Sequence, residues 1–193
     1  MKREIEPEMV AFLDAKLKDN GLAQHAIEQK DPRTVFRLAL EACVGIREKG
    51  GNNRGPVVEL IQETLGGADQ EAWCMSLVQT GLAYAELKTG VQSPIAATEH
   101  CMTCWRETPT AQRVKSVPAV GAIIVWKHGS TDSGHTGITV SDVKDGQVRA
   151  VEGNTESGIA GGEVVREGGG VYVTRRSTSG TGNMRVVGFL KPW

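Results

Sequence analysis

The spacing of apolar positions predicts helices in the first half of the chain. Five segments repeat apolar residues every three or four positions, which is the period of an amphipathic helix. Proline or a capping residue opens most of these segments and glycine closes several of them, as is typical of helix ends. The predicted helices cover residues 7–20, 31–50, 56–66, 72–88 and 93–107, the last opened by Ser93 and Pro94.

The second half of the chain has the pattern of strands and turns. Fifteen of the 24 glycines lie in residues 118–193, and turn residues separate short apolar runs there. Helices followed by a mostly antiparallel sheet predict an α+β fold. The predicted strands are 122–127, 136–143, 147–152, 170–175 and 185–190, and Asp145-Gly146 is a predicted hairpin turn.

Charge and hydropathy exclude several classes of protein. Lys and Arg number 22 against 23 Asp and Glu, so the chain lacks the basic excess of a general nucleic-acid-binding protein. The longest apolar run, Ala119–Trp126, is too short to span a bilayer, so we expect no stable membrane insertion. Glu4, Glu6 and Glu8 stand where a signal peptide needs apolar residues, which predicts synthesis in the cytoplasm without a signal peptide.

Cys74 is the first candidate for chemistry because it stands in the first turn of the predicted helix over 72–88. Unpaired backbone N–H groups and the helix dipole stabilise a thiolate at a helix N-terminus. Such a thiolate is a nucleophile that needs a neighbouring base. The alternative is a small buried apolar side chain, which is the usual environment of a free cysteine.

His135 is the candidate base because it stands at the start of a predicted strand, between small residues that leave room for a cleft. The next strand ends at Glu152, and Asn154 follows two residues later. If the two strands form a hairpin through residues 145–146, their far ends meet at one edge, where Glu152 or Asn154 reaches the imidazole. The alternatives are a surface histidine at a turn and a solvated glutamate at a strand end.

Short motifs around these residues occur in a specific order and spacing. They are Trp73-Cys74, Gly134-His135 with Gly137-Ile138, and Glu152-Gly153-Asn154. They resemble the CHAP domain (cysteine, histidine-dependent amidohydrolase/peptidase), in the single-domain form of phage endolysins and related bacterial wall enzymes. The resemblance runs from about residue 36 to residue 193. It predicts a helical N-terminal appendage over 1–32 and a CHAP-like catalytic domain over 33–193.

The resemblance implies a papain-like α+β fold, with a helical N-terminal half packed on a small, mostly antiparallel sheet. It implies Cys74 as the nucleophile and His135 as the general base and later the general acid. Glu152 would orient the histidine, with Asn154 assisting. The oxyanion would be held by the backbone N–H of Cys74, and Gln70 is a further candidate donor.

The implied substrate is bacterial peptidoglycan, cut at an amide of the stem peptide or cross-bridge or at the link between the sugar and the first alanine. We expect a monomer that acts on the cell wall after release, for bacterial lysis, and that needs no cofactor. Several CHAP proteins carry an acidic calcium loop ahead of the cysteine, but residues 68–71 hold too few acidic side chains for one. We therefore expect no required metal. A phage lysin, an injected antibacterial effector and a host enzyme all stay open.

Cys101 and Cys104 offer a competing chemistry, a redox pair or half of a zinc site. A structural zinc site needs a second matched pair, which the sequence lacks. A redox pair should begin a helix directly after a strand, whereas these cysteines lie within the predicted helix over 93–107. Both fall on one helix face, so we expect them to pack in the core.

Two other classes are weaker alternatives. A zinc hydrolase would draw its ligands from a glycine- and serine-rich loop without a rigid element beneath it. A non-catalytic wall-binding module would not need Cys74, His135 and Glu152 together. The residues that these alternatives would use are His100, His128, Asp132 and His135 for zinc, and Arg175, Arg176, Arg185 and Lys191 for an anionic wall polymer. A solvated face is the more common environment for such a basic set.

Overall fold

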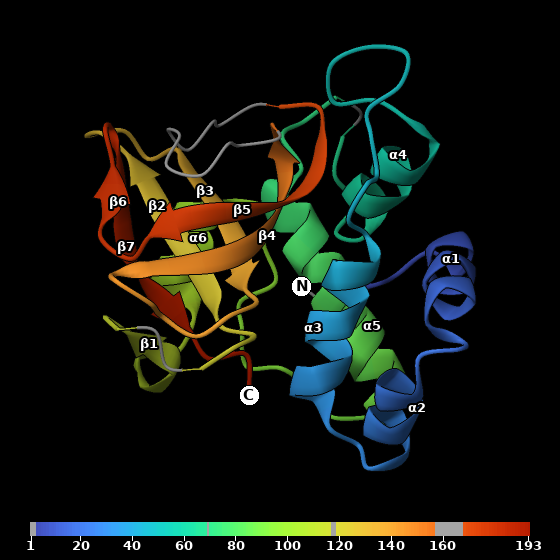
Figure 1. Ribbon diagram of the computed structural model, residues 1–193. Coiled ribbons are helices and arrows are strands. Elements are labelled where there is room, and N and C mark those ends of the chain that lie inside the picture. The colour runs from blue at the N-terminus through green and yellow to red at the C-terminus, as the bar shows by residue number, and fades with distance from the viewer. Residues whose placement is uncertain (1–2, 69, 117–118, 157–167) are drawn as a thin grey trace.

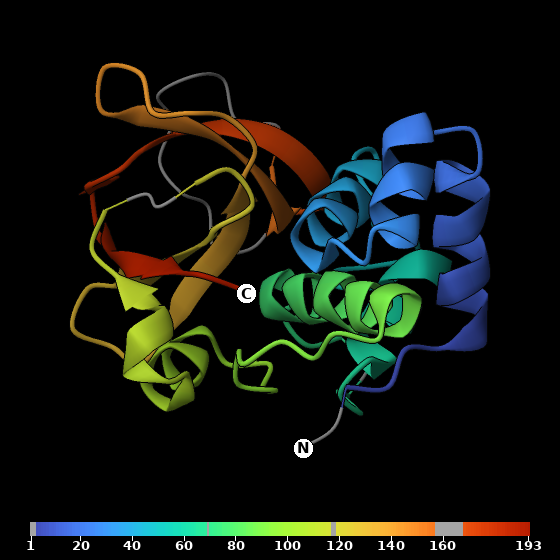
Figure 2. The same ribbon diagram turned by 90° about the horizontal axis from the view of Figure 1, so that it is seen from below.

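The computed structural model describes residues 3–68, 70–116, 119–156 and 168–193. Helices α1 to α5 gather on one side of the molecule, the sheet and α6 lie on the other, and α5 lies between α3 and the sheet (Figure 1, Figure 2). The N-terminal half supplies the helices and the C-terminal half supplies the antiparallel sheet. The predicted α+β class is therefore confirmed.

The helices begin where the sequence provides a cap or a proline. The side chain of Asn20 accepts a hydrogen bond from the Ala23 N–H, and that of Asp31 accepts one from the Thr34 N–H. Proline occupies the first position of α1, α3 and α4. The helices are α1 Pro7–Leu17, α2 Gly21–Glu28, α3 Pro32–Ala42, α4 Pro56–Glu63, α5 Cys74–Thr89 and α6 Cys101–Glu107, with the 3-10 helix η1 at Thr110–Gln112. None of the helices in the described ranges is long and apolar enough to cross a membrane.

Three predicted helices end earlier than expected, and one of them is α4, which ends at Glu63 instead of residue 66. The first ends at Leu17, and the cap at Asn20 begins α2, which the apolar spacing did not predict. The second ends at Ala42 instead of residue 50, because the chain turns there to join the sheet. Arg47 forms a β-bridge with Gly170 at the start of β5.

The helix predicted from Ser93 is wrong in its first half, because α6 begins only at Cys101. The Ser93 hydroxyl donates to the Pro192 carbonyl oxygen over 2.7 Å and accepts from the Ile95 N–H. This side chain therefore ties an extended segment to the end of the chain and caps no helix. As a result, Cys101 lies at the start of a helix and not in the middle of one.

The described strands form one antiparallel sheet with the order β1-β7-β2-β3-β4-β5, and β6 pairs with the outer part of β7. The predicted hairpin joins β3 to β4, with φ of 53° at Asp145 and 68° at Gly146, as in a type I′ turn. All five predicted strands are present with shifted ends, and β1 and β6 are additional. The strands are β1 Arg113–Val114, β2 Ile123–His128, β3 Gly134–Thr139, β4 Gln147–Thr155, β5 Gly170–Ser177, β6 Gly180–Thr181 and β7 Met184–Leu190.

The largest hydrophobic core lies around α5, which is buried along nearly its whole length. The N-terminal segment takes part in this core, because Met9, Leu13 and Leu17 of α1 belong to the same buried cluster. Arg3 adds an ion pair with Glu86 of α5, with 2.7 Å between nitrogen and oxygen. The domain boundary expected near residue 32 stays a prediction.

Candidate active site

Cys74 is the first residue of α5, as the sequence predicted, and it lies almost fully buried at the start of the helix. Trp73 directly precedes it, and its indole Nε1–H donates to Glu48 Oε1 over 3.0 Å. The Cys74 N–H is in the first turn, where no carbonyl of the same helix can accept from it. The site therefore offers a sulfur and a backbone donor at one point.

The loop that leads to Cys74 is held by side-chain amides from the preceding segments. Gln62 of α4 donates to the carbonyl oxygens of Asn53 and Glu71, over 3.2 and 2.7 Å. Asn53 donates to the Gln70 carbonyl oxygen over 3.0 Å. These bonds fix the backbone from which α5 starts.

His135 of β3 and Glu152 of β4 meet at the centre of the sheet. His135 Nε2 lies 2.9 Å from Glu152 Oε2, and both side chains are fully buried. The indole of Trp126 on β2 lies against the imidazole, with 5.6 Å between ring centroids. The hairpin therefore brings the predicted base and the predicted carboxylate together, and the solvated positions considered for them are wrong.

Arg176 of β5 is a residue of this site that the sequence analysis missed. Its Nε and Nη2 donate to the two Glu152 carboxylate oxygens over 2.7 and 2.8 Å, and the Thr174 hydroxyl donates to Glu152 Oε1. Its side chain is 3% exposed, so a solvated face is the wrong environment for this member of the basic set. The signal lay in the strand alternation, which turns Thr174 and Arg176 inward and Arg175 outward.

Hydrogen bonds and charges decide the protonation of Glu152 and His135. Burial by itself would raise the pKa of Glu152, but hydrogen bonds and charges from His135 and Arg176 lower it to about 2. Burial would lower the pKa of His135, but its interactions with Cys74 and Glu152 raise it to about 9. At neutral pH the histidine is therefore an imidazolium and donates its Nε2–H to a carboxylate.

Cys74 takes the opposite charge. A hydrogen bond from Cys101, whose Sγ lies 3.8 Å from Cys74 Sγ, is the largest cause that lowers the pKa of the Cys74 thiol. Burial opposes this shift, and the hydrogen bond and charge of His135 add to it, so that the pKa of Cys74 lies well below its ordinary value. His135 Nδ1 is buried, and none of the described residues lies within hydrogen-bond geometry of it, so this nitrogen is not engaged by any other group of the sheet. The site thus holds a thiolate beside an imidazolium.

Cys74 lines a cleft of about 330 Å³. The cleft is bounded by the loop before α5, the start of α6 and the turn before β3. Its lining residues are Glu71, Ala72, Cys74, Glu99, His100, Cys101, Asp132, Ser133 and Gly134. The cleft is therefore the place where a substrate can approach Cys74.

Asn154 and Gln70 have other contacts than those predicted for them. The Asn154 side chain is buried, and its Oδ1 accepts from the Gly168 N–H over 3.3 Å. Gln70 is exposed with φ of 70°, and the cleft lining among the described residues does not include it. Glu152 is therefore the residue that the structure brings to His135, while no hydrogen bond among the described residues joins Asn154 or Gln70 to His135 or Cys74.

The residues of the zinc alternative do not converge. Asp132 pairs with Arg106, and His135 is engaged by Glu152. Within the described parts of the chain, no group of three or more His, Cys, Asp or Glu side chains is arranged to hold a metal ion. Asp69, part of the segment considered for calcium, lies outside the described residues.

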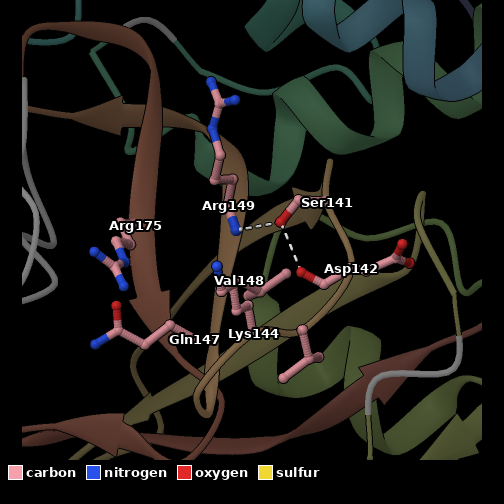
Figure 3. Close-up of a pocket in the computed structure, with 8 residues that line it drawn as sticks. Ser141, Asp142, Lys144, Gln147, Val148, Arg149 and Arg175 are labelled. Carbon is pink, nitrogen blue, oxygen red and sulfur yellow. Dashed lines mark hydrogen bonds between the residues drawn. The ribbon is translucent and has the colours of Figure 1, made fainter.

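A second hollow, of about 650 Å³, lies at the far end of the β3–β4 hairpin (Figure 3). The Arg149 N–H donates to Ser141 Oγ, and Ser141 Oγ donates to the Asp142 carbonyl oxygen, over 3.0 Å each. Its lining comes from β4, β5 and the turn between the hairpin strands, and includes neither Cys74 nor His135. The chemistry of the thiol therefore belongs to the first cleft alone.

A nucleophile, an imidazole and an orienting carboxylate in contact define a triad of the kind used for acyl transfer. The CHAP domain model matches residues 66–154, a range that includes Cys74, His135 and Glu152. Residues 66–154 are therefore similar to the CHAP domain, and this similarity implies a cysteine- and histidine-dependent hydrolase of the peptidoglycan amidase/peptidase type. No significant match was found among curated proteins or solved structures.

Proposed function

We propose that the protein hydrolyses an amide bond of bacterial peptidoglycan through an acyl-enzyme on Cys74. The observation that carries this proposal is a Cys74 thiol at the wall of a cleft, with its pKa lowered by Cys101 and His135, and a His135 that Glu152 holds over 2.9 Å. The charges of the thiolate and the imidazolium suit a nucleophile and a general acid at neutral pH.

Acylation begins when the Cys74 thiolate attacks the carbonyl carbon of the amide. A carbon–sulfur bond forms, and the carbonyl oxygen becomes an oxyanion. When this intermediate collapses, the carbon–nitrogen bond breaks and the His135 imidazolium gives its Nδ1 proton to the leaving amine. Glu152 keeps the ring oriented, because its carboxylate accepts the Nε2–H throughout.

Deacylation uses the same residues in reverse. Neutral His135 takes a proton from a water molecule, and the resulting hydroxide attacks the thioester carbon. The carbon–sulfur bond breaks, the thiolate returns, and the new carboxyl group leaves with the product. Arg176 holds Glu152 as a carboxylate in both steps, which keeps the imidazolium form of His135 available.

The oxyanion of both steps is assigned to the backbone N–H of Cys74, with the Gln70 side-chain amide as the second candidate donor. A preorganised donor of this kind contributes about 100- to 1,000-fold in rate. We assign Asn154 an assisting role, in which its buried side chain fixes the backbone after Glu152 by its bond to Gly168.

The test is mass spectrometry of soluble fragments released from purified peptidoglycan. We expect fragments from the wild type and none above background from Cys74→Ala. Cys43→Ala is the matched control, because Cys43 is also a buried free thiol but lies directly after α3 with its pKa raised to about 12. The fragment masses separate an amidase from an endopeptidase, and a chelator should change nothing.

Equal release by Cys74→Ala would contradict the thiol mechanism. No fragments from any common peptidoglycan type, with a folded wild type, would instead favour a non-catalytic wall-binding module. The proposed setting is lysis of bacteria by a monomer that reaches the wall after release from the cytoplasm, as a phage lysin or an injected effector would. A loss of turbidity of permeabilised cells with the wild type only would support that role.

A further inference from the structure

Cys101 is a second thiol at the cleft for which the proposed mechanism has no use. Its Sγ lies 3.8 Å from Cys74 Sγ, within hydrogen-bond distance for sulfur. Both side chains line the same cleft, and they are 6% and 5% exposed. Among the described residues, Cys74 is the hydrogen-bond partner of the Cys101 sulfur.

The backbone holds Cys101 in this place. It is the first residue of α6, and this end of the helix lies against β3 at Gly134, the residue before His135. A Cβ on Gly134 would lie 3.0 Å from the Cys101 Cβ and 2.5 Å from the Trp126 carbonyl oxygen. The absence of a side chain at Gly134 therefore permits the close approach of α6. This packing fixes the backbone of Cys101 and with it the position of its thiol.

Cys104, one turn further along α6, has different partners. Its Sγ lies 3.7 Å from the Ala96 carbonyl oxygen and 4.0 Å from Thr108 Oγ1. It is fully buried and is not part of the cleft lining. Of the two cysteines of this short helix, Cys101 is therefore the one whose sulfur is hydrogen-bonded to Cys74.

The direction of the hydrogen bond follows from the two protonation states. The thiolate of Cys74, together with burial, raises the pKa of Cys101 well above its ordinary value, while the pKa of Cys74 is lowered. Cys101 therefore keeps its proton when Cys74 has lost its own. The S–H of Cys101 is the donor, and the Cys74 thiolate is the acceptor.

We propose that Cys101 is a positioning residue whose S–H donates to the Cys74 thiolate, so that a donor on α6 holds the sulfur at the cleft. The consequence for catalysis rests on the proposed function. When Cys74 is acylated, its sulfur loses the charge and this hydrogen bond weakens. It forms again as the thiolate leaves in deacylation, so the donor stabilises the leaving group of that step.

The experiment measures alkylation of Cys74 by iodoacetamide across pH, with a reductant present and the Cys74 peptide followed by mass spectrometry. Cys101→Ala and Cys101→Val remove the donor, Cys101→Ser restores one, and Cys104→Ala is the matched control on the same helix. Other titratable groups at the cleft are Glu71, Glu99, His100 and Asp132, with His135 and Glu152 on the sheet. All variants keep these groups, so their contribution stays constant.

We expect the midpoint of the alkylation profile to move to higher pH in Cys101→Ala and Cys101→Val. Below that midpoint the labelling rate should fall about tenfold, the size expected for losing a hydrogen bond to a charged group. Cys101→Ser should stay close to the wild type, and Cys104→Ala should match it. A purely structural role for Cys101 would not distinguish serine from alanine.

An unmoved midpoint in Cys101→Ala or Cys101→Val would overturn the proposal, and so would an equal shift in Cys104→Ala. Circular dichroism shows whether the alanine and valine variants are folded. If they are not, Cys101→Ser is the deciding variant, and a shifted midpoint in folded Cys101→Ser would overturn the proposal. The labelling needs no peptidoglycan. Its failure is therefore distinguishable from a failure of the proposed hydrolysis, which the fragment assay reports.

Discussion

Burying Glu152 with full loss of solvent contact is costly unless every lone pair of its carboxylate is satisfied. Here the neighbours satisfy it: His135 bonds to one oxygen, Thr174 to the other, and Arg176 to both. Together with the Cys74 thiolate, the buried charges alternate in sign along the site. Each charge is tolerated because of its neighbour, so the removal of one leaves another uncompensated.

Arg176→Met should therefore lower the free energy of unfolding by about 3–5 kcal/mol, because Glu152 stays charged and buried without its cation. Urea denaturation measures the loss. Arg175→Met is the matched control, since Arg175 is the exposed neighbour on the same strand and should change stability by less than about 0.5 kcal/mol. The double variant Glu152→Gln with Arg176→Met should regain part of the stability but stay inactive. An equal loss of stability in Arg176→Met and Arg175→Met would contradict this account.

At the scale of elements, the site depends on how closely α5 approaches β4. Gly153 lies between Glu152 and Asn154, and a Cβ there would lie 2.7 Å from Leu77 Cδ2 and 2.9 Å from Trp73 Cζ3. Both residues belong to the start of α5, next to Cys74. The glycine therefore allows the nucleophile-bearing helix to pack directly on the strand that carries the carboxylate.

Gly153→Ala should lower the free energy of unfolding by about 1–3 kcal/mol, as overpacking of a core does. It should also reduce peptidoglycan hydrolysis, because relief of the contact moves the first turn of α5 away from His135. Gly21→Ala is the control, since nothing lies within 4 Å of a Cβ at the start of α2. Full activity and stability in Gly153→Ala would mean that the packing does not set the position of Cys74.

Features with a local cause could be predicted from the sequence. The Asp145-Gly146 turn and the position of Cys74 in the first turn of α5 each depend on neighbouring residues, and the turn predicted that Glu152 or Asn154 reaches His135. The helix expected from Ser93 failed because its hydroxyl bonds to Pro192, which is 99 residues away in the chain. Arg176 was missed because its contact with Glu152 depends on the register of β4 and β5, which no local pattern determines.

The charge pair also governs how the stability of the whole molecule depends on pH. The folded protein holds one proton on the Cys74–His135 pair, and it sits on His135, whose pKa is about 9. Between pH 6.5 and 9.0, the ordinary pKa values of histidine and cysteine, the unfolded chain also holds one proton on these two residues, and it is on the cysteine. Below 6.5 the unfolded chain takes up a second proton while the folded pair does not. Stability therefore falls as the pH drops below about 6.5.

The expected slope from this pair approaches about 1.4 kcal/mol per pH unit, the value for one proton. It ends where the pH reaches the lowered pKa of Cys74 in the folded state. Cys74→Ala should lack this slope, because only the imidazolium remains and both states carry it below 6.5. Urea denaturation of both proteins at a series of pH values measures the difference. Parallel curves between pH 5 and 6.5 would contradict a thiolate–imidazolium pair in the folded protein.

We expect the segment 1–32 to unfold together with the catalytic part of the chain. Leu13 of α1 is fully buried in the core that α3 and α5 share. Leu13→Ala should therefore lower the free energy of the main unfolding transition by about 2–5 kcal/mol. Leu22→Ala on α2 is the control, because Leu22 is 52% exposed and its truncation should cost less than about 0.5 kcal/mol.

Following Cys74 alkylation during the same denaturation shows whether the site opens together with this core. A single shifted transition, with Cys74 becoming reactive at the same urea concentration, would mean that α1 supports the catalytic half of the molecule. If Leu13→Ala instead produced an early separate transition and left Cys74 protected until the wild-type midpoint, the segment would be an appendage with the boundary expected near residue 32. The burial of Leu13 and the ion pair of Arg3 with Glu86 favour the single transition, because both bind the segment to the helix that carries the nucleophile.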